Sequence, residues 1–367
     1  MKKVLIFAPT APTSGITQYI LNMLCVMDTK NIHFDILSFK NHRLKAWAEA
    51  NGTEYFEFDI SPYKDPKGYT SFLKNVFSKG YDVVHFHLSS IADLRLFKFA
   101  KKSGTKRIIV HSHNSFTDVP SKLRRFVFGN LHKILRVFAN KYSDYKCACS
   151  PVAAEWMFGK SKGKTAIIMN NAVDISKFAY SDTYKKDLRE SLGITTRYVV
   201  GHVGRFSVQK NQNFLVDAFN VLSKKRDDCT LLLIGNGELT NNVRQHVKEL
   251  QLEEKVCFVD FQEDIYKYYS VMDLFVMPSL FEGLPITLVE SQANSLKSLV
   301  SDAITRSCDL TGLVEFKSLN DGPEKWAERI DTKLENCERI DCAEKIEQKG
   351  FSLKGQAKVV SNLYFGE

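Results

Sequence analysis

The sequence predicts an α/β protein of two domains, each built on a parallel β-sheet with helices on both faces. Three observations predict this class. The chain has 367 residues, which favours two domains over one. Short apolar runs alternate with amphipathic stretches along both halves, and this β-α alternation is typical of parallel sheets. A hydrophobic content of 44% with 25% charged residues is typical of a soluble globular protein.

The first half contains seven short apolar runs that we expect to form strands. They span residues 3–8, 34–39, 54–58, 83–87, 107–111, 146–149 and 166–169. Helices are expected between them, where apolar residues recur at helical spacing. These segments are residues 16–27, 70–78, 94–103 and 122–138, with two more that end near Gly52 and Phe158. A glycine just after a helical pattern is a stop signal, as at Gly52 and Gly104.

The second half repeats the alternation of strands and helices. Its expected strands span residues 198–203, 230–234, 256–259, 274–277 and 298–301. Helices are expected at residues 182–192, at 212–222 and after residue 285. The polar helix at 182–192 marks the junction between the halves. We therefore expect one domain to comprise residues 1–178 and the other residues 179–349.

Residues 278–290 are the stretch around which the second half is organised. An apolar run leads into a turn at Gly283 and a helix expected to begin at Pro285, where the missing N–H of proline costs nothing. The free N–H groups at a helix start favour an anion. The carboxylates of Glu282 and Glu290 can accept hydrogen bonds from sugar hydroxyls. An ordinary strand-to-helix connection with two exposed glutamates fits the same residues.

Other loops of the second half are suited to a phosphorylated ligand. Gly204 and Arg205 follow one strand and Lys210 lies shortly after, so that a guanidinium and an ammonium can clamp a diphosphate. The loop that begins at Gly235 permits close backbone approach. Together with the two glutamates, these loops predict a nucleotide-sugar pocket at the carboxyl edge of the sheet. No Asp-x-Asp motif occurs, so we expect no metal bridging the diphosphate.

Three features of the first half also follow strands. The loop before Gly15 opens a helix but lacks the Gly-x-Gly-x-x-Gly fingerprint of dinucleotide-binding proteins. His85 and His87 alternate along a strand and therefore face the same side, and we expect at least one of them to be structural. Residues 111–114 read His-Ser-His-Asn, which is poor core material, and this favours a role in a site.

Charge is unevenly distributed between the halves. Residues 1–178 carry 27 basic and 13 acidic side chains, a net charge of +14, and the remaining residues carry 24 and 29, a net charge of −5, which together give +9. The basic half is therefore expected to face an anionic partner. Residues 122–138 concentrate basic and aromatic side chains, and we expect this segment to contact an anionic membrane surface. A helix with an ordinary solvated basic face is the alternative. No nucleic-acid motif is present, so nucleic acid is not expected as a partner.

Compartment is indicated by what the sequence lacks. The N-terminal apolar run is too brief for a signal peptide, and no run reaches the length of a membrane span. The eight cysteines are scattered without Cys-x-x-Cys spacing, which predicts reduced thiols and neither zinc nor disulfides. We expect a cytoplasmic protein, peripheral on the inner face of the cell membrane.

These motifs resemble those of the GT-B glycosyltransferases of the large retaining family 4, nearest its bacterial capsule and exopolysaccharide members. Glu282 and Glu290 have the family's Glu-x7-Glu spacing, and the pair Arg205 and Lys210 precedes them in the expected order. Further matching segments are the loop at Gly15 and residues 111–114, 148–150, 171–174 and 351–357. The resemblance implies two Rossmann-like domains that face each other across a cleft. It also implies a last helix that crosses back, which adds residues 350–367 to the first domain.

The resemblance assigns roles to individual residues. Arg205 and Lys210 match the cations that bind the donor diphosphate, Glu282 the contact to the donor sugar, Glu290 the contact to the ribose, and His113 the histidine near the reacting centre. The remaining donor-binding positions are Gly15, Gly204, Gly235, Phe261, Gln262, Glu263, Gly283, Leu284, Pro285, Ile286 and Thr287. The chain departs from the family at Asp260 and Gln262, where glycine and arginine are usual, and this leaves selectivity for the base open.

The resemblance implies a retaining glycosyltransferase acting in surface polysaccharide biosynthesis. Its donor would be a UDP-linked hexose or N-acetylhexosamine, and its acceptor a lipid-linked saccharide or an oligosaccharide. Two alternatives stay open: a nucleotide-sugar epimerase on the same fold, and an inactive homologue that serves as an assembly scaffold. A dehydrogenase is disfavoured because neither half carries the dinucleotide fingerprint.

Overall fold

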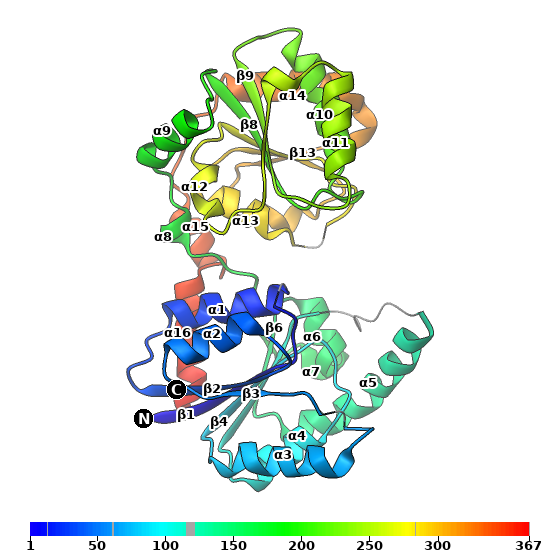
Figure 1. Cartoon of the computed structure of the whole chain (residues 1–367), viewed down its shortest axis with the longest axis vertical. Coiled ribbons are helices and arrows are strands. Elements are labelled where there is room, and N and C mark those ends of the chain that lie inside the picture. The colour runs from blue at the N-terminus through cyan, green and yellow to red at the C-terminus, as the bar shows by residue number, and fades with distance from the viewer. Residues whose placement is uncertain (13, 61, 115–121, 283, 367) are drawn as a thin grey trace. The chain divides into compact units, whose positions relative to one another are not determined.

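A computed structural model describes residues 1–12, 14–60, 62–114, 122–282 and 284–366 of the chain. These residues form two compact units (Figure 1). The N-terminal unit comprises Met1–Asn171 and Leu353–Glu367, and the C-terminal unit comprises Ala172–Ser352. The boundary differs from the expected one at 178/179 because the short helix at Ile175–Phe178 contacts helices of the C-terminal unit, and Phe178 lies in the core of that unit.

The N-terminal unit contains a seven-stranded parallel sheet. Across the sheet the strands are β3 (Tyr55–Glu57), β2 (Ile32–Ser38), β1 (Lys2–Ala8), β4 (Val83–Leu88), β5 (Arg107–Ser112), β6 (Tyr145–Ala148) and β7 (Ile167–Ile168). Its helices are α1 (Gly15–Val26), α2 (His42–Ala50), α3 (Pro66–Ser78), α4 (Arg95–Lys102), α5 (Lys122–Tyr142), α6 (Pro151–Phe158), α7 (Lys160–Gly163) and α16 (Leu353–Phe365). All seven predicted strands are present, and residues 122–138, expected to form one or two helices, lie in a single helix.

Local sequence explains where several of these helices begin. The Ser14 side chain accepts a hydrogen bond from the Thr17 N–H and so caps α1. Asp65 and Ser150 cap α3 and α6 in the same way, and each is followed by a proline in the first turn, where no N–H is needed. Each cap fixes where its helix begins, and therefore where the loop that follows the preceding strand ends.

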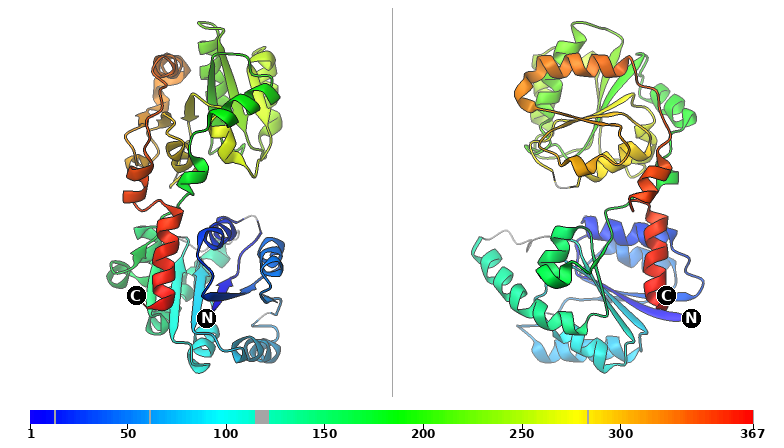
Figure 2. Two further views of the ribbon diagram at one scale, coloured as in Figure 1. Left: turned by 90° about the vertical axis from the view of Figure 1, so that its left-hand side faces the viewer. Right: turned by 180° about the vertical axis from the view of Figure 1, so that it is seen from behind.

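The last helix, α16, belongs to the N-terminal unit although it is the C-terminal element of the chain. It contacts α1 and β1, as the two views of Figure 2 show for the red helix. The Tyr364 hydroxyl shares a 2.8 Å hydrogen bond with His85 Nδ1 on β4. The Gln356 side-chain amide donates to the Asn170 carbonyl oxygen at 2.7 Å. The chain therefore returns to its first unit, as the resemblance implied.

The C-terminal unit contains a six-stranded parallel sheet. Across the sheet the strands are β10 (Val256–Val259), β9 (Cys229–Ile234), β8 (Tyr198–Val203), β11 (Leu274–Met277), β12 (Ser298–Ser301) and β13 (Val314–Lys317). Its helices are α8 (Ile175–Phe178), α9 (Asp182–Ser191), α10 (Gln212–Ser223), α11 (Thr240–Glu249), α12 (Ile265–Tyr269), α13 (Ile286–Ala293), α14 (Gly322–Leu334) and α15 (Ala343–Gln348). Five of the strands agree with prediction. The edge strand β13 was missed because its sequence, Val-Glu-Phe-Lys, has only two apolar residues.

Each sheet is covered by helices on both faces, which explains why its strands are apolar almost throughout. In the C-terminal unit, one face of the sheet packs on α12 and α13 and the other on α10, α11 and α14. In the N-terminal unit, α3, α4, α5 and α6 cover one face. No helix among the described residues is long and apolar enough to cross a membrane.

Candidate functional site

The loops of the C-terminal unit that carry the predicted donor-binding residues all follow strands at one edge of the sheet. The strand order, β10-β9-β8-β11-β12-β13, reverses direction between β8 and β11. In such doubly wound sheets, ligands bind beyond the carboxyl ends of the strands at this reversal. Lys210 lies in the loop after β8 and Glu282 in the loop after β11, so the two residues flank the reversal.

Lys210 and Glu282 form a largely buried ion pair. The distance between Lys210 Nζ and Glu282 Oε1 is 2.6 Å, and the side chains are only 15% and 8% exposed. The Gln209 side-chain amide lies within hydrogen-bond distance of Glu282 Oε2 (3.2 Å) and of the Phe281 carbonyl oxygen (3.0 Å). The Leu280 N–H donates to the Gln209 carbonyl oxygen. The two loops are therefore joined at the charged residues, and no pattern in the sequence predicts the contacts of Gln209.

Glu290 lies on α13 and faces Tyr269 of α12. The Tyr269 hydroxyl donates to Glu290 Oε2 at 2.7 Å. Burial raises the pKa of the Glu290 carboxyl to about 7, and the hydrogen bond from Tyr269 opposes this only in part. Glu290 is thus a carboxylate that is costly to ionise without a polar ligand. Tyr269 was not predicted, because a tyrosine in an apolar segment reads as core.

The first turn of α13 presents backbone N–H groups. Pro285 is the N-cap and the helix begins at Ile286, one residue later than predicted, with no side chain capping it. The early N–H groups of a helix have no intrahelical acceptor, so those of Ile286 and Thr287 are suited to an anion. Leu284 lies just before the cap. Gly283, the predicted turn, lies outside the described residues.

Glycines let neighbouring loops approach each other at this edge of the sheet. Gly235 has a φ of +130°, and a Cβ built there would lie 2.2 Å from the Gly204 carbonyl oxygen. A Cβ at Gly237 would lie 2.3 Å from the Phe206 carbonyl oxygen. A side chain at Gly204 would crowd His202 and Lys210. The glycines therefore serve the close packing of the loops, which is a structural reason for them beside the predicted ligand role.

The remaining predicted residues of this unit are more open. Arg205 is 74% exposed and pairs with Glu238, with 3.0 Å between Nε and Oε2. Phe261, Gln262 and Glu263 lie in the loop between β10 and α12, and Phe261 is 69% exposed. An exposed pair contributes little to stability, so Arg205 is free to exchange Glu238 for a ligand.

Several polar atoms near these loops are buried and lack a hydrogen-bond partner among the described residues. They are Ser279 Oγ, Thr287 Oγ1 and Gln212 Oε1. Ser279 and Thr287 flank the Glu282 loop, and the Gln212 side-chain amide donates to the Arg205 carbonyl oxygen at 2.9 Å. Such atoms normally find a partner. Their presence at one edge of the sheet is consistent with a polar ligand there.

His202 is a buried neighbour of Lys210 that sequence reasoning missed. Its Nδ1 lies 2.8 Å from the Val276 carbonyl oxygen, to which it can donate, and its Nε2 lies 3.3 Å from Gln212 Nε2. Burial lowers the pKa of His202 to about 4. It is therefore neutral near pH 7 and adds no charge beside the Lys210–Glu282 pair.

In the N-terminal unit, the predicted residues Gly15 and His113 follow β1 and β5. Gly15 is the first residue of α1, and a Cβ there would meet no atom within 4 Å. His113 Nε2 lies 2.9 Å from His87 Nδ1. Burial lowers the pKa of His113 to about 3, so that its ring is neutral near pH 7. His111 is fully buried, which makes it a part of the interior rather than an open contact.

Comparison with known proteins places these features among glycosyltransferases. Residues 184–349 match the family described as Glycosyl transferases group 1. EpsF of Bacillus subtilis (strain 168), which is named as a glycosyltransferase, is 28% identical over 341 residues, covering 90% of this chain and 87% of that protein. The UDP-Gal:alpha-D-GlcNAc-diphosphoundecaprenol alpha-1,3-galactosyltransferase of Escherichia coli is 26% identical, covering 83% and 81%. The amylovoran biosynthesis glycosyltransferase AmsD of Erwinia amylovora is 24% identical, covering 84% of each.

Solved structures agree on the fold. Anabaena HepE in complex with UDP and glucose matches with a TM-score of 0.71 at 16% identity, over 99% of both chains. A glycosyltransferase from Rickettsia africae ESF-5 matches with a TM-score of 0.73 at 16% identity, over 99% of this chain and 97% of that one. At this identity the likeness shows the fold alone. The predicted GT-B class with two Rossmann-like domains and the predicted resemblance to group 1 glycosyltransferases are confirmed.

Proposed function

We propose that this glycosyltransferase moves a hexose or N-acetylhexosamine from a UDP sugar to a lipid-linked saccharide or an oligosaccharide, with retention of the anomeric configuration, in surface polysaccharide biosynthesis. The C-terminal unit binds the nucleotide sugar and the N-terminal unit the acceptor. The main support for a donor site is the buried Lys210–Glu282 ion pair beside the start of α13, which no side chain caps. A relative that uses UDP-galactose and a diphosphoundecaprenol-linked acceptor supports the choice of substrates.

The ion pair has a function in donor binding. Without a donor, Glu282 neutralises Lys210 in a site that is largely closed to water. When the donor binds, its diphosphate takes over Lys210, and Glu282 accepts hydrogen bonds from the sugar hydroxyls. The exchange replaces one buried charge pair by another, so that neither residue is left uncompensated.

The charged groups of the site promote cleavage of the sugar–phosphate bond by stabilising the charge that develops on the diphosphate. Breaking the sugar–phosphate bond places negative charge on the diphosphate and positive character on the anomeric carbon. Lys210 and Arg205, once they have exchanged Glu282 and Glu238 for the diphosphate, stabilise it together with the N–H groups at the start of α13. With the donor bound, these groups need no further reorganisation during bond cleavage. These cations take the place of a bridging metal, so we propose that no divalent cation is needed at the diphosphate.

Retention needs no carboxylate nucleophile in this mechanism. The acceptor hydroxyl attacks the anomeric carbon from the face that the diphosphate leaves. The departing phosphate oxygen takes the hydroxyl proton as the new glycosidic bond forms. Glu290 holds the ribose hydroxyls, and that contact favours its ionised form. For His113 we propose the role of a neutral ring that donates or accepts one hydrogen bond during transfer.

Donor binding is the first test of the proposal. Calorimetric titration of UDP, GDP, ADP and their sugars into the purified protein should show UDP compounds binding most tightly. Glu290→Ala should weaken the UDP affinity, whereas Glu249→Ala, an exposed change on α11 of the same unit, should not. Equal affinity for all three nucleotides, or equal affinity of both variants for UDP, would contradict the donor assignment.

Product analysis is the second test. Incubation with a UDP sugar and a diphosphoundecaprenol-linked saccharide should give a lengthened saccharide whose new linkage has the donor's anomeric configuration by NMR. The same amount should form whether or not Mg²⁺ or Mn²⁺ is added. An isomerised nucleotide sugar formed without acceptor would instead identify an epimerase, and donor binding without any product would favour a scaffold.

Membrane contact is a further part of the proposal. Helix α5 exposes Ile134, Val137 and Phe138, which share one helix face, beside the exposed Lys133 and Lys141. We propose that this face lies on the cytoplasmic leaflet and brings the enzyme to its lipid-linked acceptor. Vesicles with anionic lipid should bind the wild type at low salt. They should bind the Ile134→Ser/Phe138→Ser variant much less, and unchanged binding of that variant would refute the contact.

A further inference from the structure

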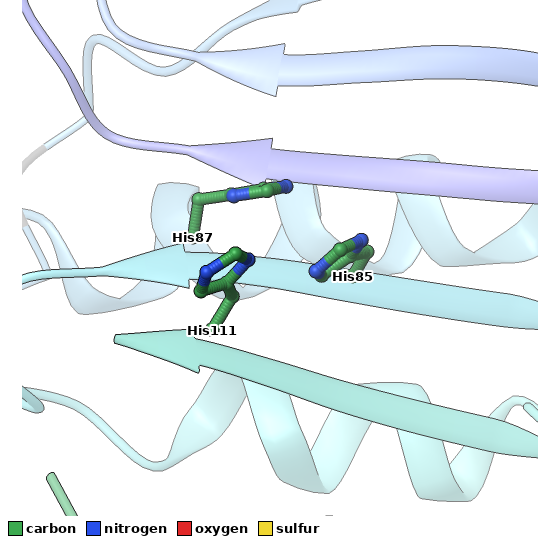
Figure 3. A group of neighbouring side chains, drawn as sticks. All are labelled: His85, His87 and His111. Atoms are coloured by element: carbon green, nitrogen blue, oxygen red, sulfur yellow. The ribbon is translucent and has the colours of Figure 1, made fainter. Parts of the chain in front are cut away.

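Three histidines of the N-terminal unit are gathered on one face of its sheet. His85 and His87 alternate along β4, and His111 lies opposite His87 on β5 in the strand register. Figure 3 shows the three rings side by side on this face. One ring nitrogen from each lies within 4.8 Å of the others, and all three side chains are buried.

This arrangement leaves polar atoms without partners. His85 Nε2 and both ring nitrogens of His111 are buried and have no hydrogen-bond partner among the described residues. The hydroxyl of Tyr19 on α1, whose ring packs edge-on against His111, is in the same condition. Buried polar atoms are normally paired, since an unpaired one costs about 1–3 kcal/mol. Four such atoms in one cluster indicate a bound species, which pairs with one nitrogen of each ring.

We propose that His85, His87 and His111 bind one divalent transition-metal ion of the kind that favours imidazole, such as Zn²⁺. Three histidines are a known ligand set for zinc, and they leave a fourth position open for water. At that position, the Tyr19 hydroxyl is the candidate partner of a bound water molecule. The site lies in the N-terminal unit and is not a metal bridging the diphosphate. A zinc ion there would correct the expectation, drawn from the cysteine spacing, that the chain binds no zinc.

The surrounding hydrogen bonds fit this role. His85 Nδ1 lies 2.8 Å from the Tyr364 hydroxyl, and His87 Nδ1 lies 2.9 Å from His113 Nε2. A proton on each Nδ1 leaves the Nε2 lone pair free for a metal, and such outer partners orient metal-binding histidines in general.

The geometry needs a modest adjustment. Tetrahedral zinc with Zn–N distances of about 2.0–2.1 Å separates its ligand atoms by about 3.3 Å. The three nitrogens, now within 4.8 Å, would therefore move together by rotation about their side-chain bonds. Because His87 contacts His113 and His85 contacts Tyr364, the metal would also fix the ring of His113 and the end of α16.

Metal content is the direct test. Untagged full-length protein is stripped with a chelator, titrated with Zn²⁺ alone, freed of excess by gel filtration, and analysed by mass spectrometry. We expect about one zinc per wild-type chain and less than about a tenth of that in His111→Asn. His132→Asn is the matched control, since His132 is also buried in this unit but both its nitrogens have partners, the Ile91 N–H and the Trp156 carbonyl oxygen. This control should retain the zinc.

A second measurement covers the case in which His111→Asn does not fold. Wild type loaded with Co²⁺ should show the intense visible bands of a four-coordinate ion without the near-ultraviolet bands of a thiolate ligand. Thiolate bands or a six-coordinate spectrum would place the metal on cysteines or on the surface and overturn the proposal. Wild type that retains no metal, or a His111→Asn variant that retains as much as wild type, would also overturn it and leave water as the occupant.

Discussion

The two units build different chemistry on the same scaffold. In both, a central parallel sheet reverses direction between two neighbouring strands, β1 and β4 in one and β8 and β11 in the other. At the N-terminal reversal, the buried imidazole of His87 lies beside the partly buried imidazole of His113. At the C-terminal reversal, Lys210 and Glu282 form a buried ion pair. The shared topology thus brings side chains together at the same place in both sheets, while the chemistry of those side chains differs.

Removal of the buried cation Lys210 is expected to have the largest effect. Lys210→Ala should lower kcat about a hundredfold to a thousandfold, because it removes a preorganised charge from the developing diphosphate. Single-turnover assays with saturating donor measure the effect. Lys225→Ala, an exposed change whose charge pairs with Glu328, serves as the control and should keep wild-type turnover. A folded Lys210→Ala variant with near wild-type kcat would remove Lys210 from the proposed mechanism.

Substitution of one loop glycine in each unit should change the free energy of unfolding by different amounts. Gly235→Ala should lower the free energy of unfolding by about 3 kcal/mol, since it combines a φ that L-residues disfavour with a Cβ 2.2 Å from the Gly204 carbonyl oxygen. Gly15→Ala, in open space at the start of α1, should change it by less than about 1 kcal/mol. Urea denaturation compares the two. Equal losses would mean that the two loops are packed alike.

The buried carboxyl of Glu290 should make the free energy of unfolding depend on pH. Its folded pKa of about 7 lies above the ordinary value of 4.5, so the folded protein binds more protons between these values and loses stability as pH rises. Glu290→Gln should therefore raise the free energy of unfolding by about 2 kcal/mol at pH 8 and hardly change it at pH 5. Thermal melts at both pH values measure this. A variant that is equally or less stable at pH 8 would show that the carboxylate is not penalised by burial.

The smallest effect concerns the helix that returns to the N-terminal unit. Tyr364→Phe should lower the free energy of unfolding by about 1 kcal/mol, because it leaves His85 Nδ1 without its partner. Tyr180→Phe in the C-terminal unit removes an exposed hydrogen bond to Asp182 and should have almost no effect. Denaturation curves of the two variants that coincide would show that the buried bond to α16 adds nothing.

Much of the candidate donor site could be predicted because its residues carry chemistry in their identity and spacing. Lys210, Glu282 and Glu290 were identified from charged residues that follow apolar runs. Their partners were not, because Gln209 and Tyr269 look like ordinary loop and core residues until the fold brings them within hydrogen-bond distance. Strand β13 was not predicted for a similar reason. As an edge strand it is only partly buried, and its sequence therefore contains too few apolar residues to be recognised as a strand.

The α/β class, the two domains and nearly every strand could be predicted from the sequence alone. Parallel strands buried on both faces appear in it as short runs of apolar residues. The sequence also determined the residue types at the carboxyl edges of the sheets. Only the tertiary structure decided which of them meet: Glu282 with Lys210, His87 with His113, and α16 with β1. The physical reason is that burial and pairing are long-range properties. The raised pKa of Glu290 and the burial of the His111 ring nitrogens depend on atoms that are distant in the chain. A local sequence pattern therefore cannot predict them.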